Sequence, residues 1–398
     1  MQKQSVDNHV RRIAILVEYP TVNGGENSIL AVLQHLLEHG PSNSDFEFCV
    51  LGPSDGAMAQ HVARLGIPSI ELNLFDADGE RISRDQAIFR LMEAVQKSGA
   101  HLVHGNSLSM GRLLGAAARQ NPSLVSTAHL RDIMKLSRAA VSDLNVNQRL
   151  IAVSDATLQF HLKQGLNENI GSVIHNGIDV ESFAAVHSAR MRVRQELGIS
   201  ADAMVLLTVG QIGLRKGLGT LAEAGRQLAG KVADIHWLLA GERFSQKPES
   251  VEFEASVINT LSSLEPGLKL HCLGYRRDVP ELMQAADVLV HAARQEPLGR
   301  VLLEAAASGL AIVATDVGGT GEILAHRESA LLVPADSPET ISSAVGELMD
   351  NPDLRKQLAA AARAKVRADF RIAQAAESLI GVWRSVLSET KKRSRPEA

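Results

Sequence analysis

The sequence contains very little cysteine and few aromatic residues. Of its 398 residues only Cys49 and Cys272 are cysteines, and Phe, Trp and Tyr together account for 3%. Two distant cysteines form neither a disulfide framework nor a CxxC pair, so we expect a reducing compartment and no thiolate metal site. No apolar run reaches the ~18 residues of a membrane-spanning helix, and the start of the chain lacks a signal-like apolar segment. These absences predict a cytoplasmic protein.

The chain also lacks a strong excess of either charge. Its formal net charge is −4 at pH 7, so no overall basic surface is present to neutralise nucleic-acid phosphates. The composition, 45% hydrophobic and 22% charged, is that of an ordinary folded protein. Its length corresponds to roughly two or three domains of about 150 residues. We therefore expect a folded, multidomain protein that does not bind nucleic acid.

Short apolar runs alternate with helical patterns along both halves of the chain. The strand-like runs cover residues 13–17, 46–51, 69–74, 102–104, 124–128, 150–153 and 173–175, and then 204–209, 237–240, 269–273, 287–292 and 311–315. Such alternation predicts parallel, doubly wound α/β sheets. We expect an N-terminal domain (1–187), a C-terminal domain (188–371), an amphipathic C-terminal helix (372–390) and a disordered tail (391–398). The polar segment from about Val180 to Asp202, helical from Ala189 to Leu197, is predicted to be a linker region.

Two acids lie at one strand-to-helix turn in the second half. Glu296 follows the strand at 287–292, and Glu304 comes eight residues later on a helix predicted from Gly299 to Ser308 and closed by Gly309. Ligands bind at the carboxyl ends of strands in open α/β sheets. The acids are therefore either ligand-binding groups or ordinary acids that complement the helix dipole.

Two glycine-containing loops connect a strand to a helix. Gly24 and Gly25 follow the first strand, where the backbone can approach an anion closely, although a simple tight turn explains them equally well. They do not form the GxGxxG pattern of dinucleotide-binding proteins. In the second half, Arg215 and Lys216 lie between Gly210 and Gly217 at a helix start, which suits a phosphate, without forming a Walker A motif.

Three other polar features are open to more than one interpretation. His129 stands at a strand end, where a lone histidine is more often packed than functional. The Asp76-Ala77-Asp78 sequence predicts a surface loop rather than a metal site. Arg131, Lys135 and Arg138 are spaced to share a helical face, which is either simply solvated or binds an anionic acceptor or a membrane surface.

Taken in order, these motifs resemble the retaining glycosyltransferases of family 4 over nearly the whole chain. The matching residues are Gly24-Gly25, His129, Val153-Ser154, the turn at 175–179, Lys216-Gly217, Gly241-Glu242, Gly274 with Asp278, Glu296 to Glu304, Gly318-Gly319 and Glu322. The resemblance implies the GT-B fold, in which two Rossmann-like domains face a cleft. It also implies that the C-terminal domain holds most of the nucleotide sugar, that the N-terminal domain holds the acceptor, and that the last helix crosses back to the N-terminal domain.

The same resemblance implies roles for individual residues. The catalytic group would comprise His129 beside the reacting face of the sugar, Lys216 on the diphosphate and Glu296 on the transferred sugar. Glu304 would accept hydrogen bonds from the ribose hydroxyls. The other donor contacts would come from Gly24, Gly25, Gln211, Arg215, Gly274, Tyr275 and Arg276, with backbone amides of Leu298 and Gly299 near the sugar.

The sequence departs from the family at Gln211, where many members carry an arginine. Arg215 or Arg294 would then have to supply the missing charge on the diphosphate. The resemblance implies sugar transfer with retention of configuration and with neither a metal nor a cofactor other than the nucleotide sugar. The alternatives are a sugar-nucleotide epimerase of the same fold and a catalytically silent nucleotide-sugar-binding protein. The acceptor stays open, with lipid-linked and polysaccharide acceptors and a peripheral contact with the cytoplasmic face of a membrane among the options.

Overall fold

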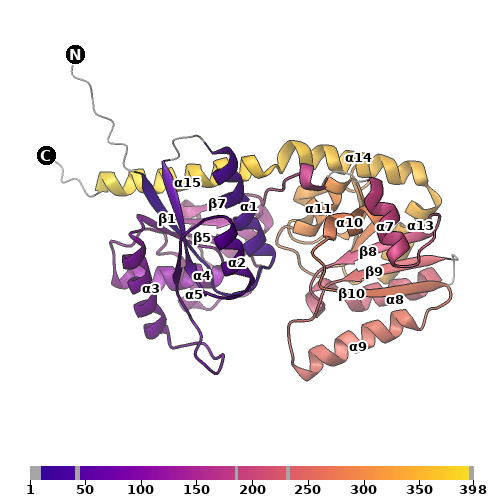
Figure 1. Cartoon of the computed structure of the whole chain (residues 1–398), viewed down its shortest axis with the longest axis horizontal. Helices are drawn as coiled ribbons and strands as arrows, with labels where there is room; N and C mark the ends of the chain where they lie inside the picture. Colours follow the sequence, from indigo (N-terminus) through magenta and orange to yellow (C-terminus); the bar gives the residue numbers. More distant parts are fainter. Residues whose placement is uncertain (1–9, 41–44, 184–186, 230–233, 394–398) are drawn as a thin grey trace, which may run out of the picture. The chain divides into compact units, whose positions relative to one another are not determined.

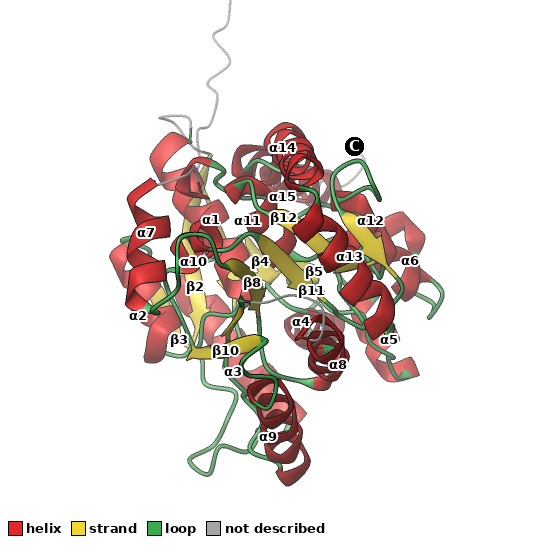
Figure 2. Cartoon of the chain, turned by 90° about the vertical axis from the view of Figure 1, so that its right-hand side faces the viewer, coloured by secondary structure: helices red, strands yellow, loops and turns green. Residues whose placement is uncertain are grey.

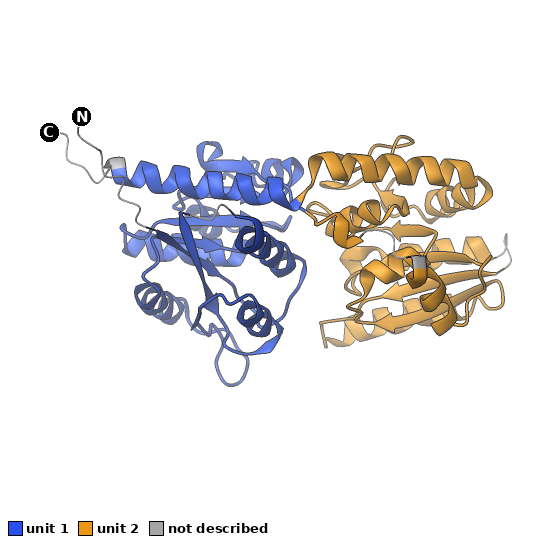
Figure 3. Ribbon diagram, turned by 45° about the horizontal axis from the view of Figure 1, so that its top comes forward, with its two compact units in different colours: residues 1–177, 372–398 blue, residues 178–371 orange. Residues whose placement is uncertain are grey.

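The chain folds into two α/β units (Figure 3). The structure is a computed structural model that describes residues 10–40, 45–183, 187–229 and 234–393. The first unit comprises residues 1–177 together with 372–398, and the second comprises residues 178–371. The division thus lies ten residues before the predicted boundary at 187/188. The segment from Ile178 onward belongs to the second unit, where Phe183 is buried.

The sheet of the first unit is entirely parallel. Its strands are β1 (Arg11–Leu16), β2 (Phe46–Gly52), β3 (Ser69–Glu71), β4 (Leu102–Gly105), β5 (Ser126–Leu130), β6 (Arg149–Ala152) and β7 (Gly171–Val173). They are arranged in the order β3-β2-β1-β4-β5-β6-β7. This is the Rossmann-like, doubly wound order, in which the direction of winding changes between β1 and β4.

Helices cover both faces of this sheet. They are α1 (Gly24–His39), α2 (Gly56–Arg64), α3 (Arg84–Ser98), α4 (Leu108–Gln120), α5 (Arg138–Leu144), α6 (Asp155–Leu162) and α15 (Ile372–Arg393). Side chains of β1 alternate: Ile13 and Ile15 pack in the core that includes α1 and α15, whereas Ala14 and Leu16 pack in the core that includes α3 and α4.

The C-terminal helix α15 packs on the first unit beside α1 (yellow in Figure 1). Its buried residues are Ala375, Ala376, Leu379, Ile380, Trp383, Val386 and Leu387. The helix continues to Arg393, so the prediction of a disordered tail from 391 is wrong for its first three residues. The rest of that predicted tail, 394–398, lies outside the described residues. The helix extends six polar residues beyond Leu387, its last apolar residue, which apolar periodicity alone does not predict.

The second unit repeats the same architecture with one strand fewer. Its strands are β8 (Met204–Val209), β9 (Ile235–Ala240), β10 (Leu268–Gly274), β11 (Val288–His291), β12 (Ala311–Thr315) and β13 (Leu331–Val333), in the parallel order β10-β9-β8-β11-β12-β13. The winding direction changes between β8 and β11. The two parallel sheets confirm the predicted α/β class. The short strand β13 was not predicted.

Eight helices are described for the second unit (red in Figure 2). They are α7 (His187–Glu196), α8 (Leu218–Ala229), α9 (Pro248–Ser262), α10 (Val279–Ala285), α11 (Arg300–Ser308), α12 (Thr320–Ile323), α13 (Pro338–Asp350) and α14 (Pro352–Asp369). Among all helices of the described ranges, none combines the length and the apolar character needed to cross a membrane.

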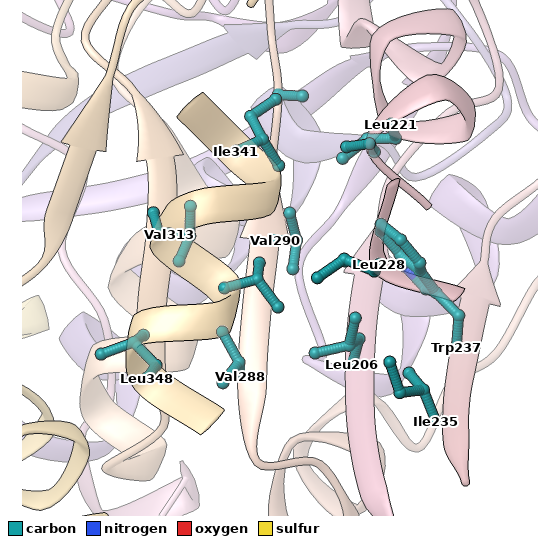
Figure 4. Close-up of a cluster of buried hydrophobic side chains, with 14 of the residues drawn as sticks. Leu206, Leu221, Leu228, Ile235, Trp237, Val288, Val290, Val313, Ile341 and Leu348 are labelled. Carbon is teal, nitrogen blue, oxygen red and sulfur yellow. The ribbon is translucent and has the colours of Figure 1, made fainter. Parts of the chain in front are cut away.

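One face of the second sheet packs against α8 and α13 (Figure 4). The central side chains, all buried, are Leu206, Leu221, Leu228, Ile235, Trp237, Val288, Val290, Val313, Ile341 and Leu348. A parallel sheet that is covered on both faces exposes polar groups only where its strands end. We therefore expect ligand-binding side chains of this sheet at its strand ends.

The predicted linker helix is an integral part of the second unit. Arg190 and Arg194 of α7 each donate to Asp287, at 2.8 Å, immediately before β11. Buried Arg194 also donates to the backbone carbonyls of Ser200, Ala201 and Ala203. Part of the polar pattern of this segment thus reflects internal ion pairs, while Arg192, Gln195 and Glu196 are exposed.

Candidate active site

A buried polar cluster lies at the winding change of the second sheet, next to the ends of β8 and β11. The Nζ atom of Lys216 lies 2.6 Å from Oε2 of Glu296, and Nε2 of His291 lies 2.9 Å from the same oxygen. Lys216 comes from the turn that follows β8, and His291 is the last residue of β11. The three side chains are between 4% and 17% exposed. The fold thus brings together groups that are 80 residues apart in sequence.

Gly217 makes this approach possible. Its φ is +65°, and a Cβ at this position would lie 1.8 Å from the backbone oxygen of Ala292. Only glycine lets the loop after β8 lie directly against the loop after β11. A backbone hydrogen bond of 2.9 Å from Arg294 to the carbonyl of Arg215 ties the two loops together. The glycine therefore sets the distance between Lys216 and Glu296.

Glu296 is held as a carboxylate. Burial would raise its pKa, but the nearby Lys216 ammonium and the hydrogen bond from His291 outweigh that effect and lower the pKa below its usual value. Burial also lowers the pKa of His291, so this histidine is neutral and donates its Nε2 proton to the carboxylate. Both contacts use Oε2, and no described residue pairs with Oε1. That oxygen can accept a hydrogen bond from a ligand hydroxyl.

Helix α11 carries the second acid. It begins after Gly299, whose φ is +105°, and ends at Gly309, whose φ is +71°. Glu304 accepts a 2.7 Å hydrogen bond from Nε of Arg300, one turn earlier, while Nη1 of Arg300 is buried without a partner within the described ranges. Leu298 is buried. A 3.0 Å hydrogen bond from the amide of Gly319 to the carbonyl of Glu296 fixes the loop before the helix.

The two cations proposed to replace the family's arginine at position 211 differ in their surroundings. Gln211 and Arg215 are exposed. Arg294 is paired with Asp336 at 2.6 Å. In the described part of the chain, Arg215 has no ion-pair partner. Arg215 is therefore the cation of the two that is not already neutralised within the protein.

The loop after β10 contains three further predicted donor contacts. Gly274 has φ +61°, and Tyr275 is 57% exposed while its amide donates to Glu242 at 3.1 Å. Arg276 makes a bidentate ion pair with Asp278, at 2.7 and 2.6 Å. This hydrogen bonding raises the pKa of Arg276 and lowers that of Asp278. The guanidinium of Arg276 thus braces the loop, and the aromatic ring of Tyr275 is the group left accessible.

In the first unit, the Gly24-Gly25 segment forms the first turn of α1 and belongs to a hydrogen-bonded network. Asn106 donates to the carbonyl of Gly25 at 3.2 Å, and Arg131 binds Asn106 twice, at 3.0 and 2.9 Å. Arg131 also donates to Asn176 at 2.9 Å. A Cβ on Gly25 would lie 2.9 Å from Cδ of Arg131, which explains the glycine. The network joins the loops that follow β1, β4 and β5.

The predicted basic face of Arg131, Lys135 and Arg138 does not exist. Residues 131–137 form a loop, and α5 begins only at Arg138 because Ser137 caps it through a 3.2 Å hydrogen bond from the amide of Ala140. Arg131 is instead committed to the network around Asn106. Helical spacing alone could not locate this start of the helix.

His129 is buried next to a second histidine. Its Nδ1 lies 2.8 Å from Nε2 of His104, and the two rings meet edge to face. Burial, and secondarily the charge of Arg131, lowers the pKa of His104 to about 3 and that of His129 well below its usual value. Both imidazoles are therefore neutral.

Sequence reasoning missed three features of these clusters: His104, His291 and the membership of Arg131 in a network. His104 and His291 occupy equivalent positions, on the strand just past the winding change of each sheet. The signal that singled out His129, a polar residue at the end of a parallel strand, applies to both. Applied consistently, it would have found them.

The Asp76-Ala77-Asp78 segment forms a turn. Oδ1 of Asp76 accepts hydrogen bonds from the amides of Asp78 and Glu80, at 3.0 and 2.9 Å. The described ranges contain no group of three or more His, Cys, Asp or Glu side chains arranged to hold a metal ion. Residues 76–80 are exposed, so this segment is a surface loop, as the sequence predicts.

Two Rossmann-like parallel sheets in one chain define an α/β protein of the GT-B class. The model for "Glycosyl transferases group 1" matches residues 190–365, and that for "Glycosyltransferase Family 4" matches residues 22–182. The chain belongs to this family of transferase enzymes, as its motifs predict.

Similar proteins agree with this assignment. The alpha-maltose-1-phosphate synthase of Mycobacterium tuberculosis is 28% identical over 370 residues, covering 85% of this chain and 90% of that enzyme. That of Mycolicibacterium smegmatis is 31% identical, but the alignment covers only 54% of this chain and 56% of that enzyme. Anabaena HepE, solved in complex with UDP-glucose, superimposes with a TM-score of 0.81 at 22% identity, over 94% of this chain and 99% of that one.

Proposed function

We propose that this protein transfers a sugar from a nucleoside-diphosphate sugar to an acceptor hydroxyl, with retention of configuration and without a metal ion. The observation that carries the proposal is the contact of Lys216 and His291 with Glu296 at the winding change of the second sheet. A cation, a neutral donor and a carboxylate with one available oxygen suit a donor that combines a diphosphate with a polyhydroxyl ring.

The donor side of the proposal lies in the second unit. Lys216, assisted by exposed Arg215, neutralises the diphosphate, Glu296 accepts a hydrogen bond from a sugar hydroxyl, and Glu304 accepts from the ribose. Tyr275, with its exposed ring, contacts the base. The complex of Anabaena HepE with UDP-glucose supports a uridine donor as the first to test.

The proposed chemical step requires no covalent intermediate with the enzyme. The bond between the anomeric carbon and the diphosphate oxygen breaks, and the acceptor hydroxyl attacks the same face of the sugar. The hydroxyl proton passes to the departing phosphate oxygen. Developing negative charge on that phosphate is the main electrostatic demand, and a preorganised cation such as Lys216 meets it.

The acceptor side lies in the first unit, around the network of Gly25, Asn106 and Arg131, with His129 two residues before Arg131. Arg131 is engaged by Asn106 and Asn176, so its charge does not by itself select an anionic acceptor. A phosphorylated sugar is the first acceptor to test, because the relatives named above include alpha-maltose-1-phosphate synthases.

We also propose that the protein is cytoplasmic. Sedimentation with anionic vesicles tests whether it contacts a membrane surface.

A thermal-shift screen of nucleotide sugars tests the donor proposal. A ligand at 100 times its dissociation constant should stabilise the protein by about 2.7 kcal/mol. Turnover of the stabilising donor is then measured with and without acceptors, and with a chelator present. Transfer to an acceptor supports the proposal. Conversion of the donor to an epimeric sugar nucleotide contradicts sugar transfer. Absence of any donor turnover contradicts an enzymatic function. Loss of activity with the chelator contradicts a metal-independent reaction.

A further inference from the structure

A chain of hydrogen bonds runs behind His129, through residues that the proposed reaction does not use. His104 of β4 lies between His129 and two other buried groups, Thr127 of β5 and Trp383 of α15. His104, Thr127 and Trp383 are all 0% exposed. Such buried, fully internal networks define the positions of protons as well as of heavy atoms.

The register of the sheet creates this arrangement. His104 and Thr127 are direct partners in the β4–β5 ladder, and His129 follows two residues later on the same face of β5. Helix α15 packs on that face, and Trp383 also contacts Phe46 and Phe48 of β2. The indole of Trp383 is thereby fixed with its Nε1 3.4 Å from Nδ1 of His104.

The identity of the donors determines the tautomer of His104. An indole N–H can only donate, so Nδ1 of His104 must present a lone pair to Trp383. The hydroxyl of Thr127, 2.8 Å from the same nitrogen, can donate or accept, so the contact with the indole decides the tautomer. Because His104 is neutral, its single ring proton is then on Nε2. That proton points along the 2.8 Å contact to Nδ1 of His129.

The tautomer of His129 follows in turn. Its Nδ1 accepts from His104, so the proton of the neutral ring is on Nε2. No described residue pairs with this Nε2. We infer that Trp383 and His104 are positioning residues that fix the proton of His129 on Nε2, so that His129 offers a hydrogen-bond donor to an oxygen of a ligand bound to the first unit. This inference rests on the proposed function for its last step only.

Nitrogen NMR of histidine-labelled protein tests the tautomer without any substrate. A neutral ring protonated at Nε2 gives one protonated-type and one lone-pair-type nitrogen signal, which couple differently to the two ring carbon-bound protons. The His104→Gln and His129→Gln variants assign the signals among the 14 histidines. The expected result is Nε2 protonation of both His104 and His129. Protonation of His129 at Nδ1 overturns the inference.

Variants then test the chain of donors. Trp383→Phe removes the indole N–H that keeps Nδ1 of His104 unprotonated. The tautomers of His104 and His129 that carry the proton on Nδ1 should then become populated. Trp237→Phe is the matched control, because the other tryptophan of the chain donates to Thr208 within the second unit. It should destabilise the protein and leave both tautomers unchanged. An unchanged tautomer in Trp383→Phe contradicts the role of Trp383.

Kinetics tests whether the tautomer is used. In His104→Gln the side-chain amide can still donate to His129, whereas His104→Leu cannot. We expect His104→Leu to lower kcat about tenfold, the equivalent of one hydrogen bond of about 1.4 kcal/mol, and His104→Gln to restore most of it. Equal kcat in the two variants refutes a positioning role. Absence of sugar transfer by the wild-type protein refutes the proposed function instead, while the NMR result stands independently.

Discussion

Replacing Lys216 by methionine should destabilise the second unit as well as remove the proposed phosphate contact. The two charges are 2.6 Å apart and their side chains are 17% and 8% exposed. At an effective dielectric constant of about 20, Coulomb's law gives a gross attraction of about 6 kcal/mol, much of which offsets the cost of burying the charges. Removing one partner of such a pair leaves an uncompensated buried charge and typically costs about 3–5 kcal/mol.

We therefore expect Lys216→Met to lower the free energy of unfolding by about 3 kcal/mol, measured by urea denaturation. The double variant Lys216→Met/Glu296→Gln should recover most of this loss, because the stranded carboxylate is gone. Arg294→Met is the matched control: its partner Asp336 is 53% exposed, and exposed pairs contribute about 0–1 kcal/mol. A loss of less than 1 kcal/mol in Lys216→Met, or additive effects in the double variant, would refute the reasoning.

The same contacts define a pH dependence. The pKa of Glu296 is lowered in the folded protein, so its ionisation stabilises the fold above its unfolded-state pKa of about 4.5, and this contribution is lost as the pH falls through the folded-state pKa. The stability difference between the wild type and Glu296→Gln should thus be constant above about pH 5.5 and should shrink under acid conditions. A difference that grows as the pH falls below 4.5 would show that the sign is wrong.

Three further variants test the positive φ of Gly217, the ion pair between Asp287 and Arg194, and the proposed contact of Glu304 with the ribose. Gly217→Ala should destabilise the protein by more than about 1–2 kcal/mol, since its φ is +65° and a Cβ would meet the carbonyl of Ala292, whereas Gly213→Ala, with open space, should be nearly neutral in thermal unfolding. Asp287→Asn should cost about 3 kcal/mol in urea denaturation, because buried Arg194 loses its counter-charge; an effect no larger than that of Asp336→Asn would contradict this. Glu304→Gln should weaken binding of a nucleoside diphosphate about tenfold in calorimetry, and unchanged affinity would exclude the ribose contact.

The sequence by itself determined the fold class and the positions of most elements. Short apolar runs predicted β8 and β12 with the observed bounds, because a sheet covered on both faces requires continuous apolar strands between polar ends. The predicted start of α11 differs from the observed start by one residue. The family followed from motifs, because glycines and strand-end polar residues are constrained locally by backbone geometry. Glu296 and Lys216 were recognised in this way, although their mutual contact was not.

Only the tertiary structure decided which of these residues meet. Lys216, His291 and Glu296 come together because the winding change places the ends of β8 and β11 side by side and Gly217 lets their loops touch. Trp383 reaches His104, 279 residues earlier in the chain, because α15 packs on the sheet of the first unit. Local sequence patterns contain no information about such distant pairs, since these depend on strand order and helix packing. For the same reason the engagement of Arg131 by Asn106 could be read only from the folded chain.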